Sequence, residues 1–191
     1  MNNIFTGKLV RLSAYDPEEL SKALSRWHRN SEYSRLLSSS LGPMPSPRTV
    51  NTWIEKEVLE FSPASYFFSI RTLAEDRLIG DLALDVVDWG GRDAFVGLGI
   101  GEAEYWGKGY GTDVMEVLLR FAFLEINLRR VTLNVFEYNP RAIRSYEKAG
   151  FQHEGRARKV LNKEGQRYDL IFMGILREEW MDKNNLPPAK E

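Results

Sequence analysis

Tyr105-Trp-Gly-Lys-Gly-Tyr-Gly-Thr112 carries three glycines at every second position, directly before a strongly apolar helix pattern. Glycine tolerates a positive φ angle and lets a ligand come close to the backbone. The first N–H groups of a helix have no partner within the helix, and they point toward whatever lies at its start, which favours an anion. The stretch therefore predicts a loop that binds a phosphate or pyrophosphate group.

Two better-known phosphate-binding loops do not match these letters. The dinucleotide pattern G-x-G-x-x-G, if it started at Gly109, would need glycine where Val114 stands. The Walker pattern would need glycine five residues before Gly107 and serine or threonine after Lys108, and the chain has Glu102 and Gly109 at those positions. A nucleotide-binding regulator that uses this loop is therefore disfavoured.

A second motif, downstream of the loop, reads Asn139-Pro-Arg-Ala-Ile-Arg-Ser-Tyr-Glu-Lys-Ala-Gly-Phe151. Together with the glycine loop, in this order and at this spacing, it strongly resembles the GCN5-related N-acetyltransferases, the GNAT superfamily. The C-terminal part resembles most the branch that acetylates ribosomal-protein N-termini and its small-molecule relatives. The residues that carry this second likeness are Gly155-Arg-Ala-Arg, Glu164-Gly165, Tyr168-Asp169, Met173-Gly174 and Glu179-Trp180.

This resemblance implies an α/β (α+β) fold and an acetyl donor. The expected architecture is a mostly antiparallel seven-stranded sheet with helices on both faces, splayed between its fourth and fifth strands, with acetyl-CoA in the split. Backbone N–H groups of the loop would bind the coenzyme A pyrophosphate; they belong to Gly107, Lys108, Gly109, Tyr110, Gly111 and Thr112. The superfamily usually opens this loop with glutamine or arginine where this chain has Trp106, and the ribosomal branch often has an aromatic residue there.

The strand before the loop alternates glycine with larger apolar residues. In Phe95-Val-Gly-Leu-Gly-Ile-Gly101 the larger side chains share one face and leave the other face bare. Two interpretations of the bare face are open: the close approach of a ligand, or a bulge or tightly packed helix. The resemblance implies that the pantetheine arm of coenzyme A pairs, as an added strand would, with the backbone of Leu98, Gly99, Ile100 and Gly101.

The downstream motif supplies candidate side chains for the reaction. Asn139 before a proline is a typical helix N-cap, and the resemblance implies that Asn139 and Ala142 also contact the cofactor. Tyr146 has the helical spacing from Ile143 that suits a core aromatic residue. The resemblance implies instead that its hydroxyl protonates the leaving thiolate as general acid. Ser145 is the alternative acid.

No general base is evident. An amine with a pKa of about 10 is mostly protonated near neutral pH, so a base or a chain of waters must remove a proton before attack. The carboxylates near the glycine strand and loop are Glu102, Glu104, Asp81 and Glu137. Each is more often a solvated surface group than a catalyst. Glu102, which leaves the glycine strand just before the loop, is included as the catalytic candidate.

Composition limits the class of protein. The chain has 191 residues, 43% of them hydrophobic, which suits a single domain over residues 1–181 with a frayed polar tail at 182–191. A formal net charge of −1 gives no basic field for nucleic acid. The chain has no cysteine for a thiolate metal site or an acyl-enzyme, and its two histidines give no metal-ligand pattern. Without a long apolar run, no membrane partner is expected and a cytoplasmic location is predicted.

Periodicity and helix-breaking residues predict alternating strands and helices. The expected strands lie at 9–12, 65–73, 77–88, 93–101 and 131–136, with two closing strands around the turn at 162–165. The expected helices lie at 17–29 and 48–60, after the glycine loop, and at 140–149. The first of these has Asp16 as its predicted N-cap, and residues 38–47, rich in proline, are expected to be a loop.

The resemblance to the GNAT superfamily therefore implies an acetyl-CoA-dependent N-acetyltransferase. The acetyl group would pass by direct attack in a ternary complex to a primary amine, either a protein N-terminus or a small molecule. The alternative is a non-catalytic acyl-CoA-binding or sensing module of the same fold. A homodimer is also expected, because the apolar segment 168–176 would present a sheet edge or face that members of this branch often cover with a second copy.

Overall fold

The computed structural model describes residues 3–39, 44–58 and 64–187, and a seven-stranded sheet runs through them. The strands lie in the order β1-β2-β3-β4-β5-β7-β6, and neighbours are antiparallel except for the parallel pair β4 and β5. Their bounds are Val10–Ser13 (β1), Ser65–Thr72 (β2), Leu78–Asp88 (β3), Asp93–Ile100 (β4), Arg130–Phe136 (β5), Gln152–Lys163 (β6) and Gln166–Leu176 (β7). The expected mixed fold with a mostly antiparallel sheet is confirmed.

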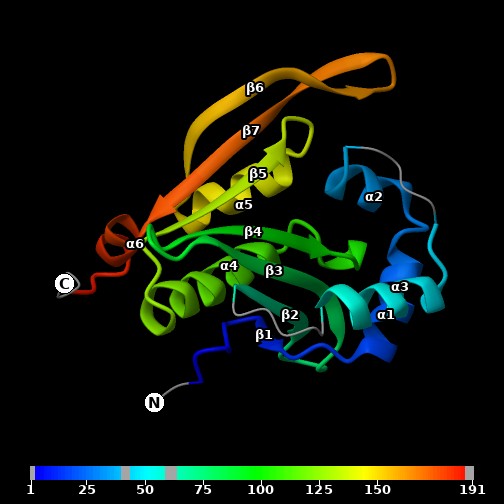
Figure 1. Ribbon diagram of the computed structural model, residues 1–191, viewed down its shortest axis with the longest axis horizontal. Helices are drawn as coiled ribbons and strands as arrows, with labels where there is room; N and C mark the ends of the chain where they lie inside the picture. Colours follow the sequence, from blue (N-terminus) through cyan, green and yellow to red (C-terminus); the bar gives the residue numbers. More distant parts are fainter. Residues whose placement is uncertain (1–2, 40–43, 59–63, 188–191) are drawn as a thin grey trace.

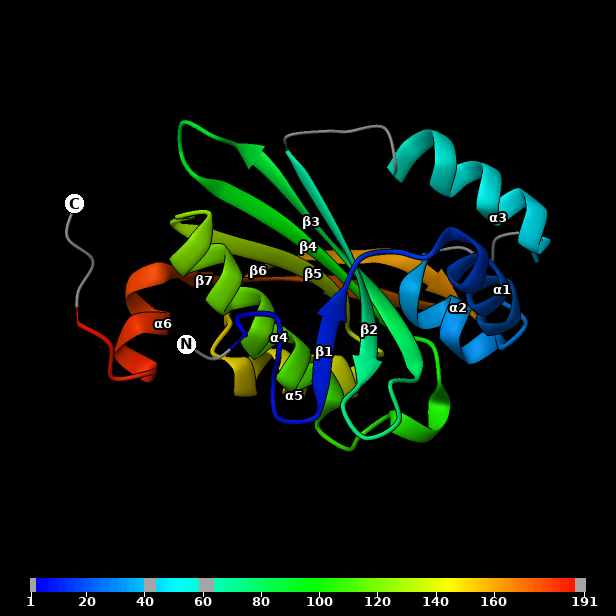
Figure 2. The same ribbon diagram turned by 90° about the horizontal axis from the view of Figure 1, so that it is seen from below.

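Helices flank this sheet (Figure 1). Their bounds are Pro17–Trp27 (α1), Ser31–Leu37 (α2), Pro47–Trp53 (α3), Tyr110–Arg120 (α4), Pro140–Ala149 (α5) and Arg177–Lys183 (α6). Two helices continue into a π-helical turn, α3 through Ile54–Val58 and α4 through Phe121–Glu125. Figures 1 and 2 show α1, α2 and α3 grouped at one end of the molecule and α6 at the other.

Two buried clusters lie on the two faces of the sheet. The larger cluster joins α4, α5 and α6 to the sheet and includes Leu82 and Leu84 of β3. The smaller cluster is built mainly from α1, α2 and α3. Because side chains alternate along a strand, Asp81, Ala83 and Asp85 of β3 point away from the larger cluster. The face of the sheet on the side of α1, α2 and α3 is therefore the more polar one.

The sheet opens between β4 and β5. Backbone pairing joins these strands only through residues 93–95 of β4 and 130–132 of β5. Beyond that point β4 stays paired with β3, while β5 pairs with β7 along its whole length. The expected splay between the fourth and fifth strands is present, and it leaves one edge of β4 from residue 96 to residue 100 without a strand partner among the described residues.

Local signals explain where the central helices begin and end. The Asp16 carboxylate accepts two backbone N–H groups in the first turn of α1, as predicted. Asn139 starts α5 by accepting the Ala142 N–H at 3.2 Å, and Gly150 ends that helix with a φ of 111°. The apolar face predicted after the glycine loop is buried in α4 and its extension; it consists of Val114, Val117, Leu118 and Phe121.

Asp113 fastens the N-terminal segment to the first turn of α4. Its carboxylate accepts the backbone N–H groups of Lys8, Leu9 and Val10 at 2.9, 2.8 and 3.0 Å. The side chain is buried. A Cβ on Gly7 would lie 2.4 Å from the same carboxylate, so the chain passes this point too closely for any larger residue. The contact sets the position of β1 relative to the glycine loop.

Two helices were not expected from the sequence. The Asn30 side chain caps α2 by accepting the N–H groups of Glu32 and Tyr33. At the other end of the chain, α6 extends to residue 183, with Trp180 and Met181 buried. The Glu179 carboxylate accepts the backbone N–H that precedes the helix at 2.9 Å. The polar tail expected at 182–191 therefore begins inside a packed helix, and its last four residues lie outside the described chain.

One other expected boundary changes, and two other predicted segments differ from the structure or lie partly outside the described residues. The segment 168–176, expected to offer a sheet edge or face, lies in β7 between β5 and β6, so it is not an edge, and the edge strand is β6. The helix expected at 48–60 begins at residue 47, where Ser46 caps it, and residues 59–60 lie outside the described chain. The loop expected at 38–47 contains residues 40–43, which also lie outside it.

Candidate active site

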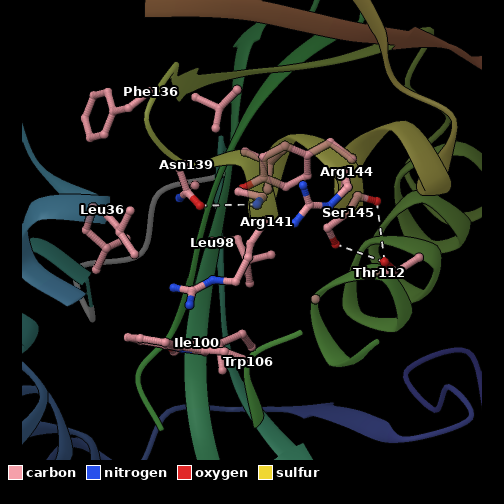
Figure 3. Close-up of a pocket in the computed structure, with 18 of the residues that line it drawn as sticks. Leu36, Leu98, Ile100, Trp106, Thr112, Phe136, Asn139, Arg141, Arg144 and Ser145 are labelled. Atoms are coloured by element: carbon pink, nitrogen blue, oxygen red, sulfur yellow. Dashed lines mark hydrogen bonds between the residues drawn. The ribbon is translucent and has the colours of Figure 1, made fainter. Parts of the chain in front are cut away.

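A cavity of about 400 Å³ occupies the opening between β4 and β5 (Figure 3). The glycine loop and the first turns of α4 and α5 form other walls, and α2 contributes from the side of the smaller cluster. The predicted site residues that line the cavity are Leu98, Gly99, Ile100, Trp106, Gly107, Gly109, Gly111, Thr112, Asn139, Ala142, Ser145 and Tyr146. Those that do not line it are Gly101, Lys108, Tyr110 and Glu102.

The glycine loop ends in an uncapped helix start that can accept an anion. Gly107 and Gly109 have φ angles of 73° and 92°, a region that favours glycine. Gly109 is the N-cap residue of α4, and no side chain caps the helix there. The first intrahelical bond runs from the Asp113 N–H to the Gly109 carbonyl. The preceding N–H groups of the first turn, those of residues 110–112, are thus left for a ligand.

Basic side chains from α5 line the same cavity, and the sequence prediction did not include them. They are Arg141, Arg144 and Lys148, which the helical spacing places on one face of α5. The Arg141 guanidinium lies over the ring of Trp106, 4.2 Å from its centroid (Figure 3). The Trp106 indole N–H donates to the Ile100 carbonyl at 2.7 Å. The i, i+3, i+7 spacing of the basic residues was the sequence signal for this face.

The bare face of the glycine strand meets protein at one end and open space at the other. A Cβ on Gly101 would lie 1.9 Å from the ring of Trp27, so helix packing explains this glycine. A Cβ on Gly99 would lie 3.0 Å from the Tyr33 hydroxyl. A Cβ on Gly97 would meet no atom within 4 Å, and Gly97 lines the cavity. Helix packing therefore explains Gly101, whereas the space beside Gly97 is open, and the close approach of a ligand there stays a prediction.

Tyr146 and Ser145 lie side by side on α5 but face different surroundings. Tyr146 is 8% exposed and packs against Phe151 with ring centroids 6.0 Å apart. Burial raises the pKa of Tyr146 to about 12. The Ser145 hydroxyl forms a hydrogen bond with the Thr112 hydroxyl at 3.0 Å. Tyr146 is thus a protonated phenol at neutral pH, and the Ser145 hydroxyl already has a partner.

Glu102 lies apart from this group. Its carboxylate accepts the Trp27 indole N–H at 2.9 Å and pairs with Arg77 at 3.1 Å and with Arg26. Burial alone would raise the pKa of Glu102, but the hydrogen bonds from Trp27 and Arg26 and the two guanidinium charges outweigh it, so the pKa is lowered. A carboxylate held in this way joins α1 to the end of β4. Glu102 does not line the cavity, and its catalytic role stays a prediction.

Comparison with known proteins identifies the family. The family described as "Acetyltransferase (GNAT) domain" matches residues 9–152 of the chain. The chain belongs to the GNAT acetyltransferase family. Among relatives of this GNAT protein, an uncharacterized SPbeta prophage-derived N-acetyltransferase of Bacillus subtilis, YokL, is 29% identical over 177 residues, which cover 92% of this chain and 94% of YokL. The probable N-acetyltransferase YjcK of the same organism is 36% identical over 115 residues, or 60% of this chain and 63% of YjcK.

Solved structures share the fold of this GNAT protein. Spermidine N-acetyltransferase from Vibrio cholerae, in complex with CoA and spermine, superposes with a TM-score of 0.77 at 23% identity, covering 90% of this chain and 98% of that one. A GNAT acetyltransferase from Bacillus anthracis gives 0.74 at 17% identity over 91% and 98% of the two chains. Family membership makes the protein an acetyl-CoA-dependent N-acetyltransferase.

Within the described residues, no helix is both long and apolar enough to cross a membrane. The same part of the chain contains no group of three or more His, Cys, Asp or Glu side chains that could hold a metal ion.

Proposed function

We propose that this acetyltransferase moves the acetyl group of acetyl-CoA to a primary amine of a small molecule, by direct attack in a ternary complex. The observation that carries the proposal is the single cavity that runs from the uncapped start of α4 to the hydroxyl-bearing side chain of Tyr146. A phosphate group, an extended amide chain and a thioester can occupy it in that order.

The pyrophosphate would bind at the start of α4. The N–H groups of residues 110–112 supply donors, and Gly107 and Gly109 leave space for the oxygens. Arg144 and Lys148 line this cavity from α5 and add positive charge. Lys108 lies in the loop but does not line the cavity. Its backbone N–H, and not its side chain, is therefore proposed to bind the pyrophosphate.

The pantetheine arm would run along the free edge of β4. Its amide groups can exchange hydrogen bonds with the strand over residues 96–99, as an added strand would. The Ile100 carbonyl already accepts the Trp106 indole N–H, so this pairing would end there. Asn139 and Ala142 line the opposite wall of the cavity. In this arrangement Gly101 supports the strand by admitting Trp27 and makes no contact with the cofactor.

Tyr146 is the proposed general acid. Its hydroxyl makes no hydrogen bond to a described residue, and a phenol with a pKa of about 12 keeps its proton at neutral pH. The developing thiolate would take that proton as the C–S bond breaks. Ser145 is the second choice, because its hydroxyl is engaged by Thr112. Glu102 is proposed as a structural group and not as a base.

Small amines are favoured over protein N-termini as acceptors by the named relatives. The Vibrio cholerae structure is a spermidine N-acetyltransferase. A relative named for the ribosomal branch is the putative ribosomal N-acetyltransferase YdaF of Bacillus subtilis, 33% identical over 108 residues, which cover 56% of this chain and 58% of YdaF. Peptides with free N-termini are therefore kept as the second acceptor class.

Thiol release from acetyl-CoA tests the proposal. The panel combines polyamines, amino acids, aminoglycosides and peptides with free N-termini, and mass spectrometry identifies the acetylated product. Thiol release with at least one amine, together with one acetyl group on its nitrogen, is the expected result. Binding of coenzyme A without thiol release from any amine would favour the non-catalytic sensing module instead.

We also propose that the acetyltransferase domain extends through α6 and forms a homodimer through the β6–β7 hairpin. The support is the free edge of β6 and the exposure of Val160 and Phe172, 52% and 40%. Light scattering at high micromolar concentration should give twice the mass of the chain, and a monomer at all concentrations would remove the dimer.

A further inference from the structure

A row of small and polar residues crosses the sheet on the side of α1, α2 and α3. Ser13 of β1 stands opposite Ser69 of β2. Ser69 stands opposite Asp81 of β3, and Asp81 stands opposite Gly99 of β4. Neighbours in such a row lie about 5 Å apart. Because Gly99 lines the cavity, Asp81 lies one strand away from the cavity wall.

Asp81 is a partly buried carboxylate without a cationic partner. The Tyr15 hydroxyl donates to its Oδ2 at 3.4 Å, and no ion pair to Asp81 is found within the described chain. Burial raises the pKa of Asp81 to about 6. Its interpretation from sequence as a solvated surface group is therefore wrong. Such a carboxylate has lost water without gaining a positive charge, so a cation that reaches it is bound favourably.

Two hydroxyl groups beside Asp81 also lack a partner. Tyr33 is 2% exposed, and its hydroxyl makes no hydrogen bond to any residue that the structure describes. This hydroxyl lies against Gly99, and Tyr33 lines the cavity. Ser69 is 1% exposed, and its Oγ is unpaired within the same residues. Buried hydroxyls are normally paired, so the three groups together point to a polar ligand group bound among them.

We propose that Asp81 is the catalytic residue that receives the ammonium group of the acceptor and takes a proton from it. The proposal rests on the acetyltransferase function proposed above. A primary ammonium group has three N–H donors. They match the Asp81 carboxylate and the two unpaired hydroxyl oxygens, and the ammonium supplies the positive charge that Asp81 lacks. Asp81 stands opposite Gly99, which lines the cavity, so an ammonium group held by Asp81 would lie beside the cavity wall.

The protons balance as follows. The acceptor nitrogen loses two protons when an ammonium becomes an amide. The first passes to the Asp81 carboxylate, and the neutral nitrogen then forms the C–N bond with the thioester carbonyl carbon through its lone pair. The C–S bond breaks with its electron pair on sulfur, which takes the proton of Tyr146, and Tyr146 recovers the second proton of the nitrogen. Asp81 releases its proton to water after the product leaves.

Three titratable groups lie on the side of the sheet that Asp81 faces. They are Tyr15 from the segment before α1, Tyr33 from α2 and, about 13 Å farther along the same face of β3, Asp85. Burial raises the pKa of both tyrosines, which stay neutral across the physiological range. Asp81 acts as a base only when ionised, so kcat/KM for the amine, which reports groups of the protein before the amine binds, should fall as the pH drops through about 6.

The experiment measures kcat, and kcat/KM for the best amine of the panel, against pH from 5 to 9 at saturating acetyl-CoA, for the wild-type protein, Asp81→Asn and Asp85→Asn. The acidic limb is read from kcat/KM. Asp81→Asn should lose a factor of about 10² to 10⁴ in kcat at pH 7. It should also lose the acidic limb and recover activity at alkaline pH, where more amine is unprotonated. Asp85→Asn removes the same charge about 13 Å along the same strand face and should keep both kcat and the limb.

Coenzyme A affinity and the melting temperature show whether each variant is folded. If folded Asp81→Asn keeps the wild-type kcat and its acidic limb, the assignment is overturned while the proposed function stands. If Asp81→Asn does not fold, the wild-type profile decides, and a kcat/KM for the amine that is constant from pH 5 to 8 overturns the assignment. A wild-type protein that binds coenzyme A but acetylates no amine overturns the proposed function and this assignment with it.

Discussion

The Ser145 hydroxyl lies 3.0 Å from the Thr112 hydroxyl, and this hydrogen bond joins α5 to the first turn of α4. A Cβ on Gly111 would lie 3.2 Å from the same Ser145 oxygen, so the two helix starts are closely packed. Thr112 stands at the anion-binding end of the cavity, and Ser145 directly precedes the proposed acid. The contact therefore fixes the distance between the proposed pyrophosphate site and the proposed point of proton transfer.

Gly107→Val should weaken coenzyme A binding by at least tenfold. Gly107 has a φ of 73° and lines the cavity, so a branched side chain there would both strain the loop and occupy ligand space. Gly165→Val is the matched control: its φ is 77°, a Cβ would likewise meet no atom within 4 Å, and it lies in the β6–β7 turn. Both variants should lose about 1 to 3 kcal/mol of stability. Calorimetric titration with coenzyme A distinguishes them, and equal affinities would remove the loop assignment.

Tyr146→Phe should lower kcat by a factor of about 10² to 10⁴, with little change in coenzyme A affinity. The ring keeps its packing against Phe151, so the melting temperature should also change little. Because an acid is active while protonated and the pKa is about 12, wild-type activity should not fall between pH 8 and 10 from loss of this proton. Steady-state kinetics on Tyr146→Phe and Ser145→Ala decide which residue is the general acid. A larger loss of kcat in Ser145→Ala than in Tyr146→Phe would assign that role to Ser145.

Asp113→Ala should destabilise the protein by roughly 2 to 4 kcal/mol, because three backbone N–H groups lose a charged acceptor. Asp88→Ala is the control. Its carboxylate accepts two backbone N–H groups, from Gly90 and Gly91, in an exposed turn where water can replace it. Urea unfolding of both variants should give a much smaller loss for Asp88→Ala, and equal losses would contradict the buried anchoring role of Asp113.

Glu102→Gln should weaken the protein without changing the pH dependence of kcat. Because the folded-state pKa of Glu102 is lowered, its contribution to stability is present above its unfolded pKa and is lost as the pH falls through the folded-state value. The melting temperature of the wild type should therefore drop more steeply than that of Glu102→Gln in the acidic range. A loss of kcat with unchanged melting temperature would return Glu102 to the catalytic group.

Asp81→Asn should raise the melting temperature at pH 7 to 8. The folded-state pKa of Asp81 is raised from 3.8 to about 6, so the native protein binds the proton more tightly and stability falls as the pH rises through that interval. The amide removes this cost, and the gain over the wild type should disappear near pH 4. A variant that is less stable at pH 8 than at pH 4, relative to the wild type, would show that Asp81 has a stabilising partner.

Local patterns predicted the fold and one wall of the site. The loop glycines and the apolar period of α4 are signals contained within a few residues, and each appears in the structure where it was expected. The two missed helices, α2 and α6, are seven residues each, so their apolar patterns are too short to detect by period. Asn30, the cap of α2, was a local signal that the sequence analysis did not use, whereas the burial of Trp180 in α6 depends on tertiary packing.

The environments of carboxylates could not be predicted from the sequence. Glu102 follows the end of β4, and Asp81 lies inside β3. The sequence analysis favoured Glu102 as the catalytic carboxylate. Glu102 is engaged by Trp27 from α1 and by Arg77, 75 and 25 residues away in the chain. Burial raises the pKa of Asp81, and the hydrogen bond from Tyr15, 66 residues away in the chain, opposes that rise. Such long-range contacts decide which carboxylate is available to a ligand.

Two-substrate kinetics of acetyl transfer is the most direct test of the proposed reaction. Initial rates are measured while acetyl-CoA and the best amine of the panel are varied, and N-acetyl product and free thiol are counted in the same samples. Direct attack in a ternary complex predicts intersecting reciprocal plots and one N-acetyl group for each thiol released. Parallel plots, or thiol released without an acetylated amine, would contradict it.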